Sequence, residues 1–291
     1  MQLPDIILSL PCWQGEPTGT RIPGGLSNEI WKVQDTGRSF IVRLGRDYPF
    51  HHVDRAREAL TARAAHRAGF GPEVLHTAPG VMVTQFLDTR TLTEADLRAD
   101  PERVARLLAD FHTAMPAEIS GAAFLFWPFH VIRDYARTLR GTRHDAPLPG
   151  YLALSARMEA AQVPLPLIFG HHDLLPANFL DDGRRLWLID YEYAGFGTAL
   201  FDLAGVATNS GMDDAATDAL VAAYFDRMPG PSLSRAFDAM QVTSLLRETM
   251  WALVSDLHLS APGVDYEAYA AENQRRLEAA LDRYRHKWDE T

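Results

Sequence analysis

Two stretches decide the fold: HHDLLPAN at residues 171–178 and LWLID at residues 186–190. The apolar residues 168–169 predict the end of a strand before the first stretch, and residues 178–180 predict a short return strand after it. Residues 181–183, Asp-Asp-Gly, are a turn signal, and the second stretch is apolar enough for a buried strand. A hairpin of this kind brings the ends of both stretches close together.

The polar residues of these stretches suit phosphoryl transfer. Asp173 can orient a hydroxyl group and accept its proton, while the Asn178 amide and the Asp190 carboxylate offer the hard oxygen ligands that Mg2+ prefers. Moving a γ-phosphoryl group needs an in-line hydroxyl and cations that neutralise the phosphate oxygens. We therefore expect Asp173 to be catalytic, Asn178 and Asp190 to bind metal, and ATP and Mg2+ to be the cofactors. His171 and Asp202 would orient the loop. The alternative is a strand-loop-strand whose polar residues only cap turns.

The spacing His-x-Asp-x-x-x-x-Asn is shared with the catalytic loop of protein kinases. Across nearly the whole chain, the order of segments resembles the choline/ethanolamine kinase branch of the aminoglycoside phosphotransferase-like kinases. The resemblance implies a kinase that phosphorylates an alcohol group, with choline or ethanolamine favoured as the acceptor. Besides residues 171–178, it is carried by residues 24–28 (nucleotide loop), 40–44 (third strand), 85–87 (interlobe hinge), 189–194 (metal motif) and 201–204, and by Arg247, Glu248, Trp251, Asp265, Tyr266 and Tyr269.

The resemblance also implies an α+β, bilobal protein-kinase-like fold. A small N-terminal nucleotide-binding lobe, with an antiparallel sheet and one helix, would cover residues 1–86. A larger, mostly helical catalytic and substrate-binding lobe would cover residues 87–291. Local patterns agree, because strand and turn signals dominate the first part and helical spacing dominates from Thr93 onward. The expected strands are residues 31–34, 39–44, 74–75 and 81–83, the expected N-terminal helix is 52–68, and Pro-rich breaks are expected at 146–150, 163–166 and 229–231.

Several residues in and before the expected sheet are candidates for nucleotide binding. Gly24 and Gly25 would let backbone N–H groups approach the phosphates, although a Gly-Gly pair alone also fits an ordinary hairpin turn. Arg43 stands where protein kinases carry a phosphate-binding Lys, and Glu58 on the next helix is its expected partner. Arg46 is an alternative phosphate contact. The sequence has neither a Walker P-loop nor a Rossmann fingerprint. The family resemblance adds Ser27, Asn28, Gln85 and Leu87 to the nucleotide site.

Aromatic residues near the C-terminus are candidates for the acceptor site, because aromatic faces and carboxylates hold quaternary ammonium groups. Trp251 lies on an expected helix over residues 232–259, and Tyr266 and Tyr269 share a face of the last helix at i, i+3 spacing. Core packing is the alternative role for all three. Glu192 is a further candidate, which would orient a metal or the acceptor.

The identity of the acceptor stays open. Choline kinases of the eukaryotic type carry an acidic and aromatic stretch after the Phe-Asp segment, whereas this chain continues VATNSGM at residues 206–212. Choline or ethanolamine is favoured, and thiamine, another amino alcohol or an aminoglycoside remains an alternative. A nucleotide-binding pseudokinase that regulates a partner is disfavoured, because no catalytic position is missing.

Composition and charge limit the class of protein and the kinds of partner that this sequence can have. With 291 residues and 47% hydrophobic content the chain can bury a large core, and its one cysteine, Cys12, excludes an internal disulfide framework and a Cys-rich zinc site. The formal net charge of -10 disfavours nonspecific nucleic-acid binding and fits a cationic, hydroxylated small molecule as partner. Residues 1–10 make a poor signal peptide and no run reaches transmembrane length, so we expect a cytoplasmic protein without nucleic-acid or membrane partners. The oligomeric state is open, with a homodimer as one option.

Overall fold

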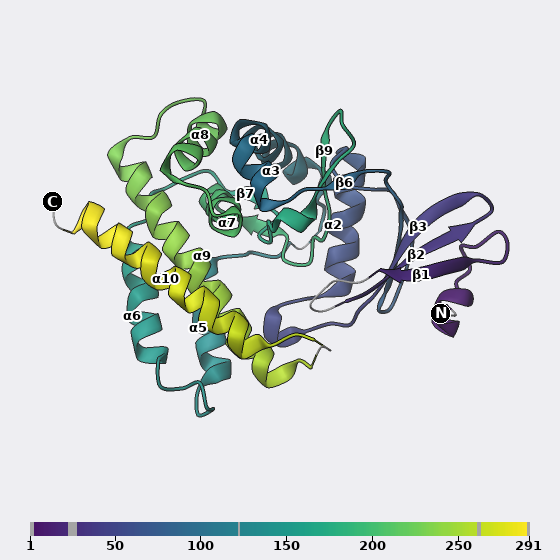
Figure 1. Cartoon of the computed structure of the whole chain (residues 1–291), viewed down its shortest axis with the longest axis horizontal. Coiled ribbons are helices and arrows are strands. Elements are labelled where there is room, and N and C mark those ends of the chain that lie inside the picture. Colours follow the sequence, from purple (N-terminus) through teal and green to yellow (C-terminus); the bar gives the residue numbers. More distant parts are fainter. Residues whose placement is uncertain (1–2, 23–27, 122, 261–262, 290–291) are drawn as a thin grey trace.

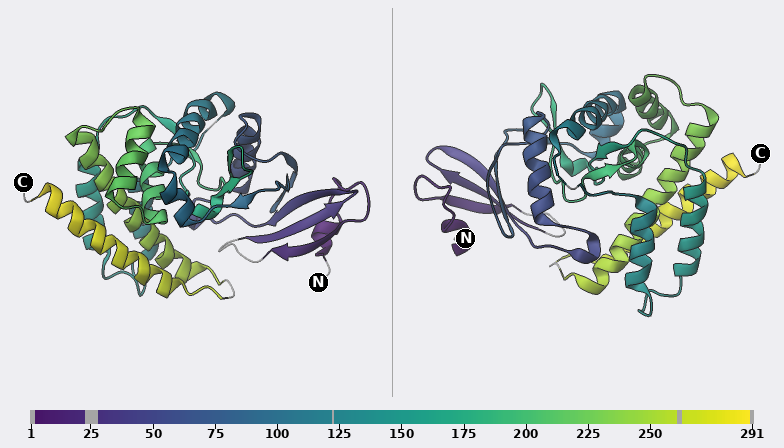
Figure 2. Two further views of the ribbon diagram at one scale, coloured as in Figure 1. Left: turned by 45° about the horizontal axis from the view of Figure 1, so that its top comes forward. Right: turned by 180° about the vertical axis from the view of Figure 1, so that it is seen from behind.

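The computed structural model describes the chain except residues 1–2, 23–27, 122, 261–262 and 290–291 (Figure 1). A five-stranded antiparallel sheet of order β1-β2-β3-β5-β4 lies at one end of the molecule, and most of the helices lie at the other (Figures 1 and 2). All four predicted strands are confirmed, and each is slightly longer than predicted. The strands of this sheet are β1 (Thr18–Ile22), β2 (Glu29–Asp35), β3 (Arg38–Leu44), β4 (Val74–Ala78) and β5 (Val81–Gln85).

The turn residues and the alternation of core-facing side chains along the strands explain why this sheet forms. Thr36 and Gly37 join β2 to β3 with φ values of 45° and 80°, which is the left-handed backbone that a two-residue hairpin turn requires. Alternate residues of the strands point into a small core, where they meet Leu3, Ile7 and Leu10 from the N-terminal segment. That segment contains the short helix α1 (Asp5–Leu8). The sequence did not predict α1, because four residues are too few to show a helical period.

Helix α2 (Arg55–Arg67) stands between the sheet and the helical part (Figures 1 and 2). The helix predicted at residues 52–68 is confirmed, but it starts later than predicted. Asp54 is the N-cap, and its side chain accepts hydrogen bonds from two backbone N–H groups of the first turn. A capping carboxylate fixes a helix start in this way, so Arg55 is the first helical residue.

The helical part is built around two long C-terminal helices, α9 (Pro231–His258) and α10 (Tyr266–Trp288), which lie side by side (Figures 1 and 2). The turn η1 (Pro49–His51) connects this part to the sheet, because Nε2 of His51 lies 2.8 Å from Oγ of Ser255 on α9. The other helices are α3 (Glu94–Ala99), α4 (Pro101–Glu118), α5 (Pro128–Leu139), α6 (Leu148–Ala160), α7 (Ala199–Ser210) and α8 (Asp214–Phe225).

The predicted Pro-rich breaks are only partly correct. Residues 163–166 lie outside helices, as predicted, and α9 begins at Pro231, one residue before the predicted start at residue 232. The break at residues 146–150 ends early, because α6 begins at Leu148 and includes Pro149 and Gly150. Proline is tolerated in the first helical turn, where its missing N–H group would have no partner anyway.

Short strands carry the two stretches that decide the fold. They form a two-stranded sheet, β10-β7, and a three-stranded sheet, β6-β8-β9, both antiparallel. These strands are β6 (Arg90–Thr91), β7 (Ile168–Gly170), β8 (Phe179–Asp181), β9 (Leu186–Leu188) and β10 (Gly195–Gly197).

Within the described residues, no helix has the length and apolar character needed to cross a membrane.

Candidate active site

One buried carboxylate holds the loop that follows β7. Asp202, in the first turn of α7, accepts hydrogen bonds from the backbone N–H groups of His171 (2.8 Å) and His172 (2.7 Å). Its Oδ2 also lies 2.8 Å from Nε2 of His112. Burial alone would raise the pKa of Asp202, but the neighbouring His172 and the hydrogen bonds from His112 and His172 hold it well below its ordinary value. The predicted role of Asp202 in structuring the loop is thus confirmed.

The ring of His172 fills the space beneath this loop. His172 has a φ of 63°, and its ring stacks on Phe126 with 4.5 Å between the ring centroids. A Cβ at Gly197 would lie 2.7 Å from the His172 ring, and a Cβ at Gly195 would lie 2.7 Å from the carbonyl oxygen of Phe124. The backbone of β10 can approach this closely only because it carries no side chains at these positions.

The hairpin brings the three predicted chemical residues to one place. Nδ2 of Asn178 donates a hydrogen bond to the carbonyl oxygen of Asp173 (2.7 Å). The N–H of Ile189 donates to the carbonyl oxygen of Asn178 (3.1 Å), so Asp190 follows directly beside it. Nε2 of His171 lies 2.9 Å from the carbonyl oxygen of Ile189, which confirms that His171 orients the loop. The predicted closeness is confirmed, while the chemical roles of these residues remain predictions.

Asp173 is buried among three carboxylates and one arginine. Burial raises the pKa of its carboxyl group well above the ordinary value, and the carboxylates of Asp190, Glu192 and Glu248 raise it further. Arg247 opposes them by favouring the ionised form. A cation bound at this place would lower the pKa of Asp173, as Arg247 does.

Arg43 links the sheet to Asp190. Nη1 of Arg43 lies 2.6 Å from Oδ1 of Asp190, and Nη2 contacts the buried carboxylate of Glu58 on α2. The predicted pairing of Arg43 with Glu58 is therefore confirmed. Burial lowers the pKa of Arg43, and Asp190 counteracts this, so the guanidinium remains charged.

Arg55 extends this series of ion pairs. It was not among the site residues predicted from the sequence. Its Nη1 lies 2.7 Å from Oε2 of Glu58 and 2.9 Å from Oε2 of Glu192. Burial raises the pKa of Glu192, Asp190 raises it further, and Arg55 and Arg43 oppose the rise. The i, i+3 spacing from Arg55 to Glu58 was a signal for the first contact. No local signal exists for the second, because 137 positions separate its partners.

The remaining predicted nucleotide residues are only partly described. Gly24, Gly25 and Ser27 lie outside the described residues, whereas Asn28 is described and partly buried. Gln85 ends β5, with its N–H bonded to the carbonyl oxygen of Glu73 (2.9 Å). Leu87 follows in the connection to the helical part, and its carbonyl oxygen accepts from the Thr89 hydroxyl (3.3 Å). Their contacts with a nucleotide remain predictions.

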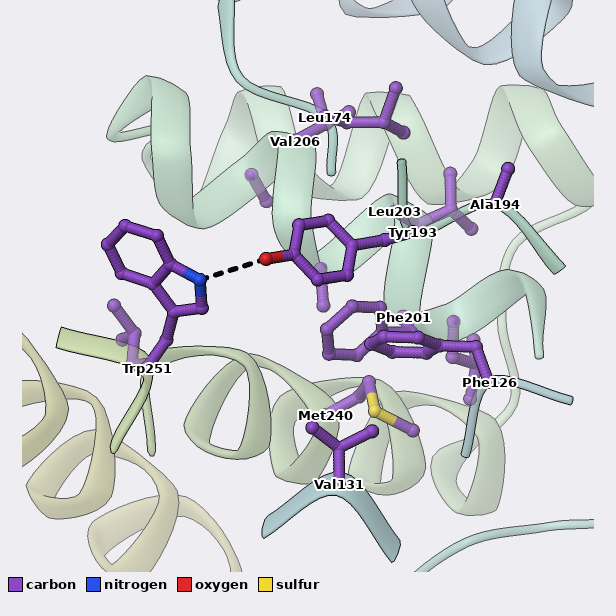
Figure 3. Close-up of a cluster of buried hydrophobic side chains, with 14 of the residues drawn as sticks. Phe126, Val131, Leu174, Tyr193, Ala194, Phe201, Leu203, Val206, Met240 and Trp251 are labelled. Carbon is purple, nitrogen blue, oxygen red and sulfur yellow. Dashed lines mark hydrogen bonds between the residues drawn. The ribbon is translucent and has the colours of Figure 1, made fainter. Parts of the chain in front are cut away.

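The three predicted acceptor-site aromatics come together at α9 and α10. The ring centroid of Trp251 lies 6.2 Å from that of Tyr266 and 6.1 Å from that of Tyr269. The Trp251 indole N–H donates to the Tyr193 hydroxyl (2.9 Å; Figure 3). His51 stacks on Trp251 with 5.0 Å between centroids. The convergence predicted for these residues is present, and much of each ring surface is used in packing.

A small polar crevice lies beside Asp173, between α7 and α9. Its volume is about 20 Å³. Two of the residues that line it, Arg247 and Glu248, were not predicted as site residues, although they stand close to Trp251 in the sequence. Within the described residues, Nε and Nη2 of Arg247 are buried without a hydrogen-bond partner. The crevice is lined by His172, Asp173, Leu174, Phe201, Asp202, Gly205, Asn209, Ser244, Arg247 and Glu248.

Asn178 and Asp190 form a donor set that fits Mg2+ bound with a nucleotide. In the part of the chain that the structure describes, no three His, Cys, Asp or Glu side chains are grouped as an all-protein metal site. Mg2+ usually keeps several waters and takes one or two carboxylates together with substrate phosphates. An amide oxygen and one carboxylate are therefore consistent with Mg2+ held jointly by protein and nucleotide.

Comparisons with known proteins point the same way as this geometry. The sequence profile of the phosphotransferase enzyme family (APH) matches residues 18–227. A probable ethanolamine kinase of Arabidopsis thaliana is 28% identical over 63% of this chain, and the match spans about half (54%) of that protein's length. Protein LicA of Haemophilus influenzae is 26% identical over 89% of this chain and 77% of its own. The crystal structure of a choline/ethanolamine kinase family protein from Mesorhizobium loti superimposes with a TM-score of 0.79 at 28% identity, covering 95% of this chain and 92% of that one.

Proposed function

We propose, from the premise that the chain belongs to the phosphotransferase enzyme family, that it is an ATP- and Mg2+-dependent kinase of a small amino alcohol. The observation that carries this proposal is the convergence of Asp173, Asn178 and Asp190 on one hairpin, with Asp190 joined to the Arg43–Glu58 pair. Choline and ethanolamine are the favoured acceptors, in keeping with the names of the relatives.

The proposed reaction assigns one task to each of these residues. The oxygen of the acceptor hydroxyl bonds to the γ-phosphorus, its proton passes to Asp173, and the bond from the γ-phosphorus to the bridging oxygen breaks as ADP leaves. Asn178 and Asp190 would hold Mg2+, which when bound supplies positive charge to the phosphate oxygens. Arg43 would bind phosphate through its guanidinium and is held in place by Glu58.

The other residues in the proposal position the two substrates. The nucleotide would contact Gly24, Gly25, Ser27 and Asn28 on one side and Gln85 and Leu87 on the other. Glu192 and the packed aromatic cluster of Trp251, Tyr266 and Tyr269 would flank the acceptor site. Residues 1–86 would form the nucleotide-binding lobe, and residues 87–291 would supply the catalytic loop and the acceptor site.

An aminoglycoside is the second candidate acceptor, and the acidic surroundings of Asp173 favour it. The carboxylates of Asp190, Glu192 and Glu248 all influence Asp173. However, a polycationic antibiotic needs a wide cleft, whereas the crevice beside Asp173 has a volume of about 20 Å³. A small head group is the better fit.

A turnover assay tests the proposed function. The protein is incubated with ATP and Mg2+ and with choline, ethanolamine, thiamine or an aminoglycoside, and ADP release is measured. We expect release with an amino alcohol, and we expect Asp173→Ala to lower kcat by about 10²- to 10⁴-fold, the usual contribution of a general base. Calorimetry of the same variant should still detect nucleotide binding. Near-wild-type turnover by Asp173→Ala would falsify the assignment of the base.

A further inference from the structure

The aromatic cluster has little free ring surface to offer a ligand. One face of Trp251 is stacked against His51 with an interplanar angle of 20°, and the indole makes edge-to-face contacts with Tyr266 and Tyr269. The indole N–H is already bonded to Tyr193. Trp251 is 7% exposed and Tyr266 is 5% exposed. Quaternary ammonium groups are held by open aromatic faces, so this cluster is a poor cage for one.

A fixed carboxylate, by contrast, stands next to the cluster. Oε2 of Glu248 accepts from Nη1 of Arg247 (2.8 Å), and Oε1 accepts from the Tyr269 hydroxyl (2.8 Å). Glu248 precedes Trp251 by three residues on α9, so both lie on one face of the helix. The Glu248 side chain is 19% exposed, and each of its oxygens can accept a further hydrogen bond. A carboxylate that is already held in place loses little freedom when it binds a ligand.

Glu248 and Asp173 line the same crevice, and the size of the crevice limits what can enter it. About 10–15 Å³ is needed to hold one water molecule, so a volume of about 20 Å³ admits a group of that size. A primary ammonium group is comparable to water, whereas a trimethylammonium group carries three additional carbon atoms. The crevice therefore favours the smaller head group.

Arg247 does not repel a cation from this crevice as an isolated charge would. Glu248 balances its charge through their direct ion pair, and the carboxyl groups of Asp190 and Glu192 also act on Asp173. Nε and Nη2 of Arg247 are buried and lack hydrogen-bond partners among the described residues.

We propose that Glu248 determines acceptor specificity and selects an amine with N–H groups, as in ethanolamine, over a quaternary amine such as choline. An N–H group can donate a charge-assisted hydrogen bond to the carboxylate, and a methyl group cannot. This inference rests on the proposed kinase function and narrows its substrate class.

A methylation series tests the proposal on the unmodified enzyme. The value of kcat/KM is measured for ethanolamine, its N-methyl and N,N-dimethyl derivatives, and choline. We expect kcat/KM to fall with each methyl group and to be about tenfold or more lower for choline than for ethanolamine, because hydrogen bonds to charged groups are among the stronger ones. The KM for ATP should be the same with every acceptor.

A charge variant assigns the preference to one residue. Glu248→Gln keeps the side-chain shape, and we expect it to lower kcat/KM for ethanolamine about tenfold while changing that for choline about threefold or less. Glu248→Asp keeps the charge and should keep the order of the series. The matched control is Glu278→Gln, which removes an exposed carboxylate from α10 and should change neither value.

Two results would overturn the proposal while leaving the kinase function intact. One is a kcat/KM for choline that equals or exceeds that for ethanolamine in the unmodified enzyme. The other is an equal loss with both acceptors in Glu248→Gln, which would show a structural role. Absence of turnover with every member of the series would instead overturn the proposed function, and the specificity with it.

Discussion

At the scale of single residues, Asp202 shows how one side chain sets the geometry of the loop that carries Asp173. Its carboxylate accepts from two consecutive backbone N–H groups and lies against His112. A neutral amide of the same shape presents an N–H group to at least one of these donors. We expect Asp202→Asn to lower the free energy of unfolding by roughly 2–4 kcal/mol, as for other broken buried networks. Urea denaturation measures this change, and a loss below about 0.5 kcal/mol would contradict the role given to Asp202.

The same residue has a consequence for acid stability. The folded state holds the pKa of Asp202 well below its ordinary value of about 3.9. The unfolded chain therefore binds the proton more readily, and the stabilisation from Asp202 is present above about pH 4 and is lost as the pH falls toward the folded pKa. Unfolding free energies measured from pH 6 to pH 3 should fall less steeply for Asp202→Asn than for the unmodified protein. Parallel curves for the two proteins would show that folding does not lower the pKa of Asp202.

At the scale of elements, α2 is the part that joins the sheet to the segment after β9. Arg43 and Arg55 alternate with Asp190, Glu58 and Glu192 in one continuous chain of ion pairs. Removing Arg55 leaves a single arginine among three carboxylates. We expect Arg55→Met to destabilise the protein by about 3–5 kcal/mol, as for other broken buried pairs.

A double-mutant cycle separates this pairing from simple loss of packing. Glu192→Gln removes the charge that Arg55 neutralises, so the double variant should be less destabilised than the sum of the single variants. We expect a coupling energy of about 0.5–3 kcal/mol from thermal or urea unfolding of the four proteins. Strict additivity would mean that the contact between Arg55 and Glu192 contributes nothing.

At the scale of the whole molecule, the proposed nucleotide site would couple ligand binding to global stability. A ligand that binds only the folded state adds about 2.7 kcal/mol at 100 times its dissociation constant. We therefore expect a nonhydrolysable ATP analogue with Mg2+ to raise Tm by about 5 °C or more. Chelation of Mg2+ with EDTA should reduce the shift, because Asn178 and Asp190 would then contact the nucleotide without a metal. An unchanged Tm at saturating analogue would argue against the nucleotide site.

The fold and the centre of the candidate site were predictable because their signals are local or ordered along the chain. The hairpin that carries Asp173, Asn178 and Asp190 has strand and turn signals within about twenty residues. The Arg43–Glu58 pair followed from its place on a strand and the next helix. In contrast, packing of Ile7 against the sheet and of His51 against Trp251 depends on tertiary contacts, for which a single sequence carries no period. The contact of Arg55 with Glu192 was missed for the same reason.

The glycines around His172 bear on how this protein can be re-engineered. Gly195 and Gly197 lie so close to Phe124 and His172 that even a methyl group at either position would collide with its neighbours. Directed-evolution libraries should leave both codons invariant, since a side chain at either position would force the neighbouring atoms to shift. Randomisation is better confined to α9 and α10, where acceptor preferences can be screened without disturbing the residues that support the loop carrying Asp173.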